Sequence, residues 1–431
     1  MEQVMTLNAS LSKTETAIEK ENKYGAHNYH PLPVVLERGE GVFVWDVEGK
    51  KYFDFLSAYS AVNQGHCHPR IIQALKNQAE KLTLTSRAFH SSLLGEFEEY
   101  MTRLFNFDKV LLMNSGVEAV ETALKLCRKW AYQVKGVPEN QAIIVFAKGN
   151  FHGRTLSVVS ASTDPSSRTG FGPFMGGIET IPYNDLNALK QILESNKNIA
   201  GFIVEPIQGE AGVVVPDDNY LPGVQQLCQE HNVLFIADEI QTGIARTGRL
   251  LATCGNCTCD NVSACEGTPS VKPDILILGK ALSGGVFPVS AVLANDEIML
   301  TIKPGEHGST FGGNPLACAV AREALQVVID ENLAENALKM GKLFRKGLEE
   351  IAQRNKLITL VRGKGLLNAI VIDSGEDSDL AWDICLKFRD NGLLAKPTHG
   401  NKIRLAPPLV ITEAQIHESL SIIEKSLNAF V

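Results

Sequence analysis

The stretch VLFIADEIQTG, residues 233–243, decides the fold, because an unbroken apolar run ends abruptly in two carboxylates, Asp238 and Glu239. Apolar runs without polar alternation are typical of strands that are buried on both faces of a sheet. A carboxylate at the end of such a strand costs free energy unless it meets a positively charged or hydrogen-bonding partner. The stretch therefore predicts an inner strand whose acids either bind a ligand or serve as ordinary capping or salt-bridged groups.

Similar apolar, β-branched runs lie on both sides of this stretch and are separated by helix-like segments. The runs are KVLLM (109–113), AIIVF (142–146), GFIVE (201–205), DILILG (274–279) and PVSAVLA (288–294). Repeated alternation of strand and helix is typical of an α/β domain with a mostly parallel sheet. We therefore predict a large α/β domain over residues 60–315.

The two ends of the chain have a different pattern. Residues 34–56 alternate between polar and apolar side chains and contain glycine turns, which predicts a small antiparallel sheet. The chain is helical after about residue 316 and then mixes strands and helices. We expect an N-terminal arm and small-domain segment in residues 1–59 and a C-terminal segment in residues 316–431, which together form one smaller α+β domain.

The composition argues against several classes of protein. The 431 residues include 49 acidic and 41 basic side chains, and this balance does not favour binding to nucleic acid or to an anionic membrane. We find no apolar run near the roughly 18 residues that cross a bilayer. The first 23 residues contain four glutamates and no arginine, unlike a mitochondrial presequence, so we expect a cytoplasmic protein.

In an α/β sheet, ligands bind at the carboxyl ends of the strands, so the residues after each apolar run are candidates for chemistry. After the run at 109–113, Ser115 and Glu118 form a capping-box pattern that predicts a helix start near Gly116. A helix N-terminus has unpaired backbone N–H groups and a positive dipole end, which suit a phosphate. An ordinary capped helix explains the same pattern.

Lys280 directly follows the run at 274–279. A lysine at the end of a buried strand can lose its charge and act as a nucleophile, although a snorkelling lysine has the same pattern. The helix start near Gly116, the acid Asp238 and Lys280 are together what pyridoxal phosphate needs for its phosphate, its ring nitrogen and its aldehyde. The combination predicts this cofactor more strongly than any of the three features alone.

The stretches FIADEIQTGIARTGR (235–249) and PDILILGKALSGG (273–285) closely resemble the signature of the fold-type I, class-III aminotransferases. Further motifs of the class recur in order from about Tyr24 to near the end of the chain. They are GHCHP (65–69), NSGVEA (114–119), FHGRT (151–155), EPIQGEAG (205–212), HGSTFGGNP (307–315) and VRGKGLL (361–367). The resemblance implies a pyridoxal-phosphate-dependent transferase with a mostly parallel seven-stranded sheet in its large domain.

The resemblance also implies the roles of the cofactor residues. Lys280 binds the cofactor and later moves the proton, while Asp238 pairs with the ring nitrogen. Thr310 matches a residue that reaches the phosphate of the neighbouring subunit, which implies a homodimer with shared active sites. The other implied cofactor contacts are Ser115, Gly116 and Val117 at the phosphate, Phe151 stacked on the ring and Gln241 at the ring hydroxyl oxygen.

Within the class, the sequence is most similar to the members that transaminate ornithine at its δ-amino group with 2-oxoglutarate. Tyr29 matches a residue that contacts the ornithine α-amino group, and Tyr59 matches an aromatic residue of the substrate pocket. Arg154 matches an arginine that grips the distant ornithine carboxylate. Transamination of acetylornithine or 4-aminobutyrate is the alternative within the class, and the two tyrosines argue against it.

The second substrate, 2-oxoglutarate, reacts at a carbon next to a carboxylate and needs an arginine near the ring, a role that Arg404 matches. The resemblance implies that Glu210 pairs with Arg404 in the first half-reaction and releases it in the second, which would be a charge switch between two substrates. Glu205 is expected to support this site from behind. Without the resemblance, each of these residues taken alone is better explained by a surface charge or a structural ion pair.

Cys254, Cys257, Cys259 and Cys265 lie in a polar, turn-rich stretch that does not match the class pattern. The C-x-x-C spacing is typical of a zinc site or a thiol pair. We favour an inert surface loop, and a reversible disulfide with a thiol-redox partner and a small zinc knuckle stay open. A thiol- or zinc-centred protein is the alternative of another class. For GHCHP we predict no metal site, because no further ligand lies nearby in the sequence.

Overall fold

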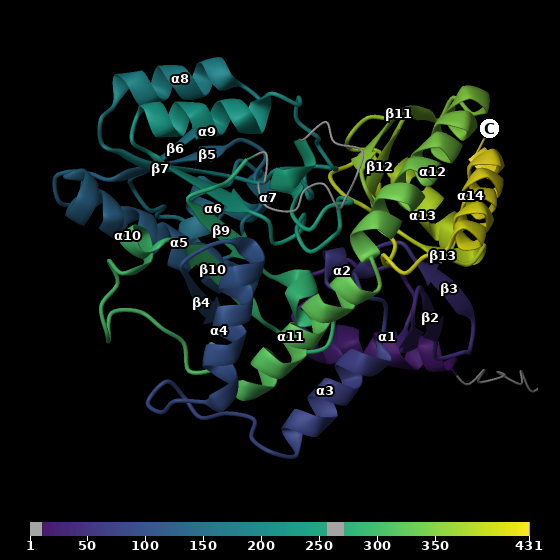
Figure 1. Ribbon diagram of the computed structural model, residues 1–431. Coiled ribbons are helices and arrows are strands. Elements are labelled where there is room, and N and C mark those ends of the chain that lie inside the picture. Colours follow the sequence, from purple (N-terminus) through teal and green to yellow (C-terminus); the bar gives the residue numbers. More distant parts are fainter. Residues whose placement is uncertain (1–10, 257–270, 431) are drawn as a thin grey trace, which may run out of the picture.

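The computed structural model describes residues 11–256 and 271–430, and its centre is a seven-stranded sheet (Figure 1). The strand order is β4-β10-β9-β8-β7-β5-β6. The strands are β4 (Lys109–Met113), β5 (Ile143–Ala147), β6 (Ile178–Ile181), β7 (Ile199–Val204), β8 (Leu234–Asp238), β9 (Ile275–Leu278) and β10 (Ser290–Ala294). Only β10 runs antiparallel to its two neighbours, so the predicted mostly parallel sheet is confirmed.

Helices cover both faces of this sheet, which explains why its strands lack polar alternation. On β7, Phe202 and Val204 pack in one hydrophobic cluster with α8 (Leu186–Ser195) and α9 (Tyr220–Glu230). The intervening Ile203 packs in another cluster with α5 (Gly116–Trp130). Figure 1 shows α8 and α9 stacked together beyond one face of the sheet.

The largest hydrophobic cluster joins the sheet to helices that precede and follow it in the sequence. Met101, Leu276 and Phe344 all belong to this cluster, which continues into the C-terminal part of the chain. The helices around the sheet are α2 (Ser57–Ser60), α3 (Pro69–Ala79), α4 (Ser92–Phe105), α6 (Leu156–Ala161), α7 (Pro165–Arg168), α10 (Asp296–Met299) and α11 (Pro315–Asp330).

The two ends of the chain meet in one small sheet. The N-terminal strands β1 (Leu36–Glu40), β2 (Phe43–Asp46) and β3 (Lys51–Asp54) are antiparallel, as predicted for this region, and β13 (Leu393–Leu394) pairs with β3. Figure 1 shows these N-terminal strands beside the C-terminal helices. The remaining C-terminal elements are α12 (Leu333–Arg354), β11 (Ile358–Lys364), β12 (Leu367–Ile372), α13 (Leu380–Asp390), β14 (Lys396–Pro397), β15 (Lys402–Leu405) and α14 (Glu413–Leu427). The domain boundaries stay a prediction.

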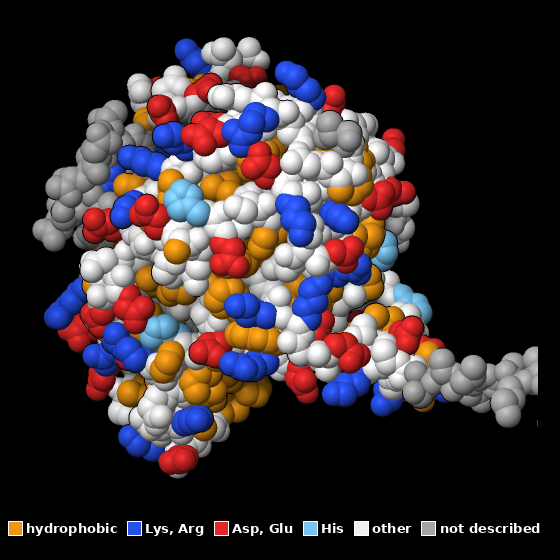
Figure 2. Space-filling model, turned by 90° about the vertical axis from the view of Figure 1, so that its right-hand side faces the viewer, with side chains coloured by type: hydrophobic (Ala, Val, Ile, Leu, Met, Phe, Trp, Pro, Cys, Tyr) orange, Lys and Arg blue, Asp and Glu red, His pale blue; other side chains and the backbone are white. Residues whose placement is uncertain are grey.

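The described part of the N-terminal arm contains a helix, α1 (Lys13–Tyr24), which Ser12 and Glu15 cap with a capping box. Every residue of α1 is at least partly exposed. In residues 11–256 and 271–430, no helix is long and apolar enough to cross a membrane. On the face drawn in Figure 2, acidic and basic side chains are interspersed.

Cys257, Cys259 and Cys265 lie outside the described residues. The three interpretations of the cysteine stretch therefore stay open.

Candidate active site

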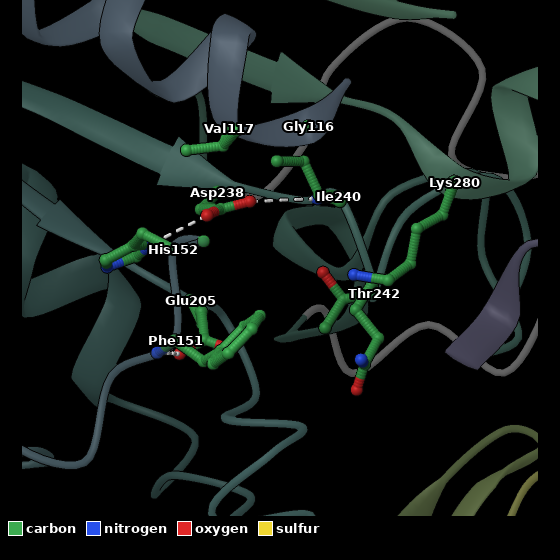
Figure 3. Close-up of a pocket in the computed structure, with 11 residues that line it drawn as sticks. Gly116, Val117, Phe151, His152, Glu205, Asp238, Ile240, Thr242 and Lys280 are labelled. Atoms are coloured by element: carbon green, nitrogen blue, oxygen red, sulfur yellow. Dashed lines mark hydrogen bonds and ion pairs between the residues drawn. The ribbon is translucent and has the colours of Figure 1, made fainter. Parts of the chain in front are cut away.

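Five strand ends of the large sheet border one cavity (Figure 3). Gly116 follows β4, Phe151 follows β5, Glu205 follows β7, Asp238 ends β8 and Lys280 follows β9. Four of these strands, β9, β8, β7 and β5, are consecutive in the sheet and parallel to one another. Their carboxyl ends therefore lie at the same edge of the sheet. The fold thus brings together residues that are up to 164 positions apart in the sequence.

The N-terminus of α5 forms one wall of the cavity. Ser115 is the N-cap residue, and its side chain and that of Glu118 form the predicted capping box. A Cβ atom on Gly116 would lie 3.1 Å from the Ile240 side chain, so glycine lets this turn pack closely. Gly116 and Val117 line the cavity, whereas the Ser115 side chain is exposed and acts as the cap. The wall therefore has the geometry of an anion site.

Asp238 is only 4 % exposed, and its carboxylate contacts the buried His152 ring. The carboxylate Oδ2 lies 2.6 Å from His152 Nδ1, while Oδ1 accepts a hydrogen bond from the Ile240 amide (Figure 3). Burial alone would lower the pKa of His152, but the hydrogen bond and the negative charge of Asp238 outweigh it and raise the pKa. The pair holds a carboxylate with a fixed orientation at the cavity wall.

His152 was missed by the sequence reasoning, although it lies inside the motif FHGRT that supplied Phe151 and Arg154. The available signal was its position after β5, a strand parallel to β8, which carries Asp238, and separated from it by β7 alone. A buried acid needs a partner, and a histidine at a neighbouring part of the same sheet edge is a suitable one.

Glu205 is a second buried acid that borders the cavity. Its Oε2 accepts a hydrogen bond of 3.0 Å from the Phe151 amide. Burial raises the pKa of Glu205 to about 7, against the opposing effect of His152, and the nearby Asp238 charge adds to the increase. Glu205 therefore changes its charge near neutral pH, in contrast to an exposed glutamate.

Glu239 is the acid for which the ordinary capping interpretation is right. Its two carboxylate oxygens accept hydrogen bonds from the amides of Ala252 and Thr253 and from the Thr242 hydroxyl. These bonds hold the chain that follows β8, and Glu239 itself does not line the cavity. The two adjacent acids of the opening stretch thus have different functions.

Lys280 extends its side chain into the cavity from the start of a 3₁₀ turn (Figure 3). Its φ of +41° lies in the left-handed region, which a lysine rarely adopts. Burial lowers the pKa of Lys280, and the charges of Glu210 and Asp238 only partly offset this effect. A lysine with a lowered pKa has a larger neutral fraction and is a better nucleophile and base.

Arg404 and Glu210 form a buried ion pair beside the cavity. Arg404 is 2 % exposed, and its guanidinium Nη1 lies 2.6 Å from Glu210 Oε1 and 3.2 Å from Gln241 Oε1. Gln241 Nε2 also donates a hydrogen bond of 2.8 Å to Glu210. Burial would raise the pKa of Glu210, but the Arg404 charge outweighs it and keeps that pKa below its ordinary value. The Glu210 carboxylate is therefore ionised at neutral pH.

The other expected substrate residues lie outside the cavity-lining set. The Arg404 guanidinium lies 4.9 Å from the centre of the half-buried Tyr59 ring, and the Arg154 guanidinium lies 5.6 Å from the centre of the Phe151 ring. Arg154 is exposed, and Tyr29 is 68 % exposed, so in a single chain neither is enclosed. Thr310 is also exposed and does not line the cavity.

Comparison with known proteins identifies the family of the chain. The sequence model of the class-III aminotransferase family matches residues 24–427. The chain is a class-III aminotransferase. The mitochondrial ornithine aminotransferase of Rattus norvegicus is 64 % identical over 417 residues, which cover 97 % of this chain and 91 % of the relative.

Two solved structures support the same assignment of this aminotransferase. The ornithine aminotransferase of Toxoplasma gondii is 47 % identical with a TM-score of 0.92, and the match covers 98 % of this chain and 96 % of that one. The acetylornithine aminotransferase of Elizabethkingia anophelis is 59 % identical with a TM-score of 0.87, and the match covers 97 % of this chain and 100 % of that one. The fold-type I architecture that the sequence motifs implied is confirmed.

The cavity of the aminotransferase fits the cofactor of its class. The α5 N-terminus offers amides for a phosphate, Asp238 offers a carboxylate to a ring nitrogen, and the Lys280 amine points into the same space. His152 Nε2 is buried without a hydrogen-bond partner among the described residues. At least one polar atom of the cavity lining therefore has a hydrogen bond left to make.

Both histidines of the motif GHCHP contact carboxylates of other segments. His66 Nε2 lies 2.7 Å from Asp54, and His68 Nε2 lies 2.9 Å from Glu331. Within the described ranges, no group of three or more His, Cys, Asp or Glu side chains is arranged to hold a metal ion.

Proposed function

We propose that this aminotransferase transfers the δ-amino group of L-ornithine to 2-oxoglutarate, giving glutamate 5-semialdehyde and glutamate by a ping-pong mechanism. The chain would thus be an ornithine δ-aminotransferase. The observation that carries the proposal is the buried pair of Arg404 and Glu210 beside the cavity that contains Lys280. An arginine that pairs with either Glu210 or a substrate carboxylate can accept two substrates, of which only one has a carboxylate next to the reacting carbon.

The cofactor of the proposed reaction is pyridoxal 5'-phosphate. When bound, it supplies an aldehyde that exchanges with amines and a ring that withdraws electrons from the reacting carbon. Lys280 holds this group and, once displaced by substrate, moves the proton at the reacting carbon. Asp238, oriented by His152, keeps the ring nitrogen protonated. The amides at Gly116 and Val117 hold the phosphate, Phe151 lies against the ring, and Gln241 contacts its hydroxyl oxygen.

The Arg404–Glu210 pair separates the two half-reactions. The δ-carbon of ornithine carries no carboxylate, so a free arginine next to it would be unpaired, and Glu210 neutralises that arginine. 2-Oxoglutarate has a carboxylate next to its reacting carbonyl, and this carboxylate replaces Glu210 as the partner of Arg404. Only one group has to move for the site to accept the second substrate.

The far end of ornithine is held by groups at the cavity entrance. Arg154 binds the α-carboxylate, Tyr29 contacts the α-amino group, and Tyr59 forms an aromatic wall next to Arg404. The proximity of Arg154 to Phe151 supports this arrangement, because it places the guanidinium near one side of the cofactor ring. Glu205 supports the cavity from behind through the Phe151 amide.

The proposed assembly is a homodimer in which Thr310 contacts the phosphate in the partner subunit. The exposure of Thr310 in the single chain supports this role. A cytoplasmic location stays a prediction from the acidic N-terminal segment. The name of the rat relative places that relative in mitochondria, so fractionation of cells is the experiment that decides the location.

A spectral titration tests the proposed reaction. Purified holoenzyme should lose its yellow colour when ornithine is added and regain it with 2-oxoglutarate. Rates with ornithine, N-acetylornithine and 4-aminobutyrate are then compared. We expect the highest kcat/KM with ornithine, and a higher value with N-acetylornithine would instead support the activity named for the Elizabethkingia relative.

A further inference from the structure

The turn that carries Glu210 is held in an unusual backbone conformation. The amides of Gly212 and Val213 both donate hydrogen bonds of 3.2 Å to the Gly209 carbonyl oxygen, which closes a tight loop around Glu210. Gly212 has a φ of +96°, and the fully buried Val213 has a φ of +59°. A β-branched residue rarely adopts such a conformation, so surrounding contacts must enforce it.

Two side chains of the C-terminal sheet enforce the position of this turn. Thr398, at the end of β14, donates a hydrogen bond of 2.6 Å from its hydroxyl to the Glu210 carbonyl oxygen. Arg362, on β11, donates a hydrogen bond of 2.8 Å from Nε to the Gly212 carbonyl oxygen. Thr398 is almost fully buried, so its hydroxyl is shielded from competing water.

The same C-terminal sheet also carries Arg404, on β15 next to the β14 strand. The Arg404 guanidinium and the Glu210 backbone are therefore both attached to one rigid element. With the turn held at the Glu210 and Gly212 carbonyl oxygens, the smallest motion that frees Arg404 is a rotation of the Glu210 side chain. This motion is smaller than a loop movement and keeps the closed position well defined.

We propose that Thr398 is a positioning residue for substrate selectivity, which holds the Glu210 backbone so that its carboxylate covers Arg404 until a dicarboxylate arrives. The inference rests on the proposed function, because it assumes that the Arg404–Glu210 pair discriminates between the two substrates. Loss of the Thr398 hydroxyl would leave a buried carbonyl without this donor, and the turn would shift and loosen the pair.

The test is Thr398→Val, which removes the hydroxyl and keeps the shape of the side chain. The two half-reactions are measured separately on the holoenzyme, one with ornithine and one with L-glutamate. We expect the ratio of kcat/KM for glutamate to kcat/KM for ornithine to rise about fivefold, the effect of roughly one lost hydrogen bond. Glutarate, which has no reacting carbonyl, should also bind more tightly in calorimetry because Arg404 is more often free.

Matched variants separate positioning from general damage. Thr398→Ser should restore the wild-type ratio because it keeps the hydroxyl. Thr359 is an exposed residue of β11 whose hydroxyl donates a hydrogen bond to the Val371 carbonyl oxygen of β12. Thr359→Val removes this hydroxyl and should leave the ratio unchanged. An equal loss of both half-reactions in Thr398→Val, with unchanged glutarate binding, would overturn the inference.

Glu210→Gln distinguishes failure of the inference from failure of the proposed function. If Glu210→Gln raises the glutamate-to-ornithine ratio and Thr398→Val does not, the switch exists and Thr398 does not position it. If the wild-type enzyme does not react with ornithine, the proposed function is wrong. The proposed role of Thr398 in ornithine selectivity is then wrong as well.

Discussion

Four acidic side chains near the cavity show how surroundings decide what a carboxylate can do. Asp238 is oriented by a histidine, and Glu239 accepts hydrogen bonds from backbone amides. Burial leaves Glu205 with a pKa of about 7, whereas an arginine keeps Glu210 ionised. All four are carboxylic acids, so only their partners separate the proposed cofactor ligand Asp238, the structural cap Glu239, the titrating Glu205 and the proposed switch Glu210.

Lys280 is the residue whose loss should stop the reaction. Lys280→Ala removes both the amine that binds the cofactor and the base at the reacting carbon, so we expect kcat to fall by a factor on the order of 10² to 10⁴ or more. Added methylamine should restore part of the rate, because it replaces the missing base. Lys190→Ala, which changes an exposed lysine of α8, should be fully active. Normal turnover of Lys280→Ala, measured in a single-turnover experiment with ornithine, would contradict the assigned role.

Glu205 should make stability depend on pH. Its pKa is raised from 4.5 to about 7, so between these values the folded protein binds a proton that the unfolded chain has released. The free energy of unfolding therefore contains a contribution that is complete below about pH 4.5 and is lost as the pH rises through 7. The raised pKa of His152 acts in the same direction.

Glu205→Gln keeps an acceptor for the Phe151 amide and removes this titration. The difference in unfolding free energy between wild type and variant should fall by roughly 2 to 3 kcal/mol from pH 5 to pH 8. Urea denaturation at several pH values measures it. Parallel pH profiles for the two proteins would show that Glu205 does not titrate in this range.

At the scale of elements, the sequence predicted the strands that are buried on both faces. Six apolar runs correspond to strands of the large sheet, and the helix start at Gly116 was also predicted correctly. β6 was missed because Ile178–Ile181 is a short edge strand that is only partly buried and has no continuous apolar run. The antiparallel direction of β10 was not predicted either, because direction depends on the connection and not on the composition of a strand.

Some local conformations had no sequence signal at all. Ser57, Ala58, Tyr59 and Ser60 all have a positive φ, although none is a glycine. The Asp54 carboxylate accepts hydrogen bonds from the amides of Leu56 and Ser57, and the Ser57 hydroxyl donates to the Ala406 carbonyl oxygen. Two local contacts and the long-range one to Ala406 thus fix the turn that presents Tyr59. The family resemblance could name Tyr59, but the pattern of residues could not predict its backbone.

The N-cap of α5 offers a test of whether a helix terminus binds the phosphate. Ser115→Ala removes the side chain that accepts a hydrogen bond from the Glu118 amide. We expect a loss of about 1 kcal/mol in stability and about a fivefold weaker binding of pyridoxal phosphate, because the first turn of α5 frays. Titration of the apoenzyme with the cofactor gives the dissociation constant.

α14 provides the matched control, because Thr412 and Gln415 cap it with the same capping box far from the cavity. Thr412→Ala should reduce stability by a similar amount and leave cofactor binding unchanged. Equal cofactor affinities in the two variants would mean that the α5 terminus does not contribute to the phosphate site.

At the scale of the whole molecule, several exposed features point to a second copy of the chain. Thr310 is exposed, and the adjacent Phe311 is 52 % exposed although it is a large apolar residue. Asn114, next to the α5 cap, donates a hydrogen bond of 2.7 Å to Ser309 in the same segment. The segment with Thr310 is thus fixed to the site of its own chain while its outer side chains are free to enter another.

A hybrid dimer tests whether two subunits share each active site. One subunit carries Lys280→Ala, and the other carries Thr310→Asp, whose negative charge would repel a phosphate held by the partner. Co-expression with two different tags allows the hybrid to be purified.

If Thr310 serves the partner, the site that keeps Lys280 receives an intact Thr310 from the other subunit, and the opposite site has lost both groups. The hybrid should then have about half the activity of the wild-type dimer, although both parent homodimers are inactive or nearly so. If Thr310 serves its own subunit, each site of the hybrid lacks one group and the hybrid is as inactive as its parents. That result would contradict shared sites and confine the cofactor contacts to a single chain.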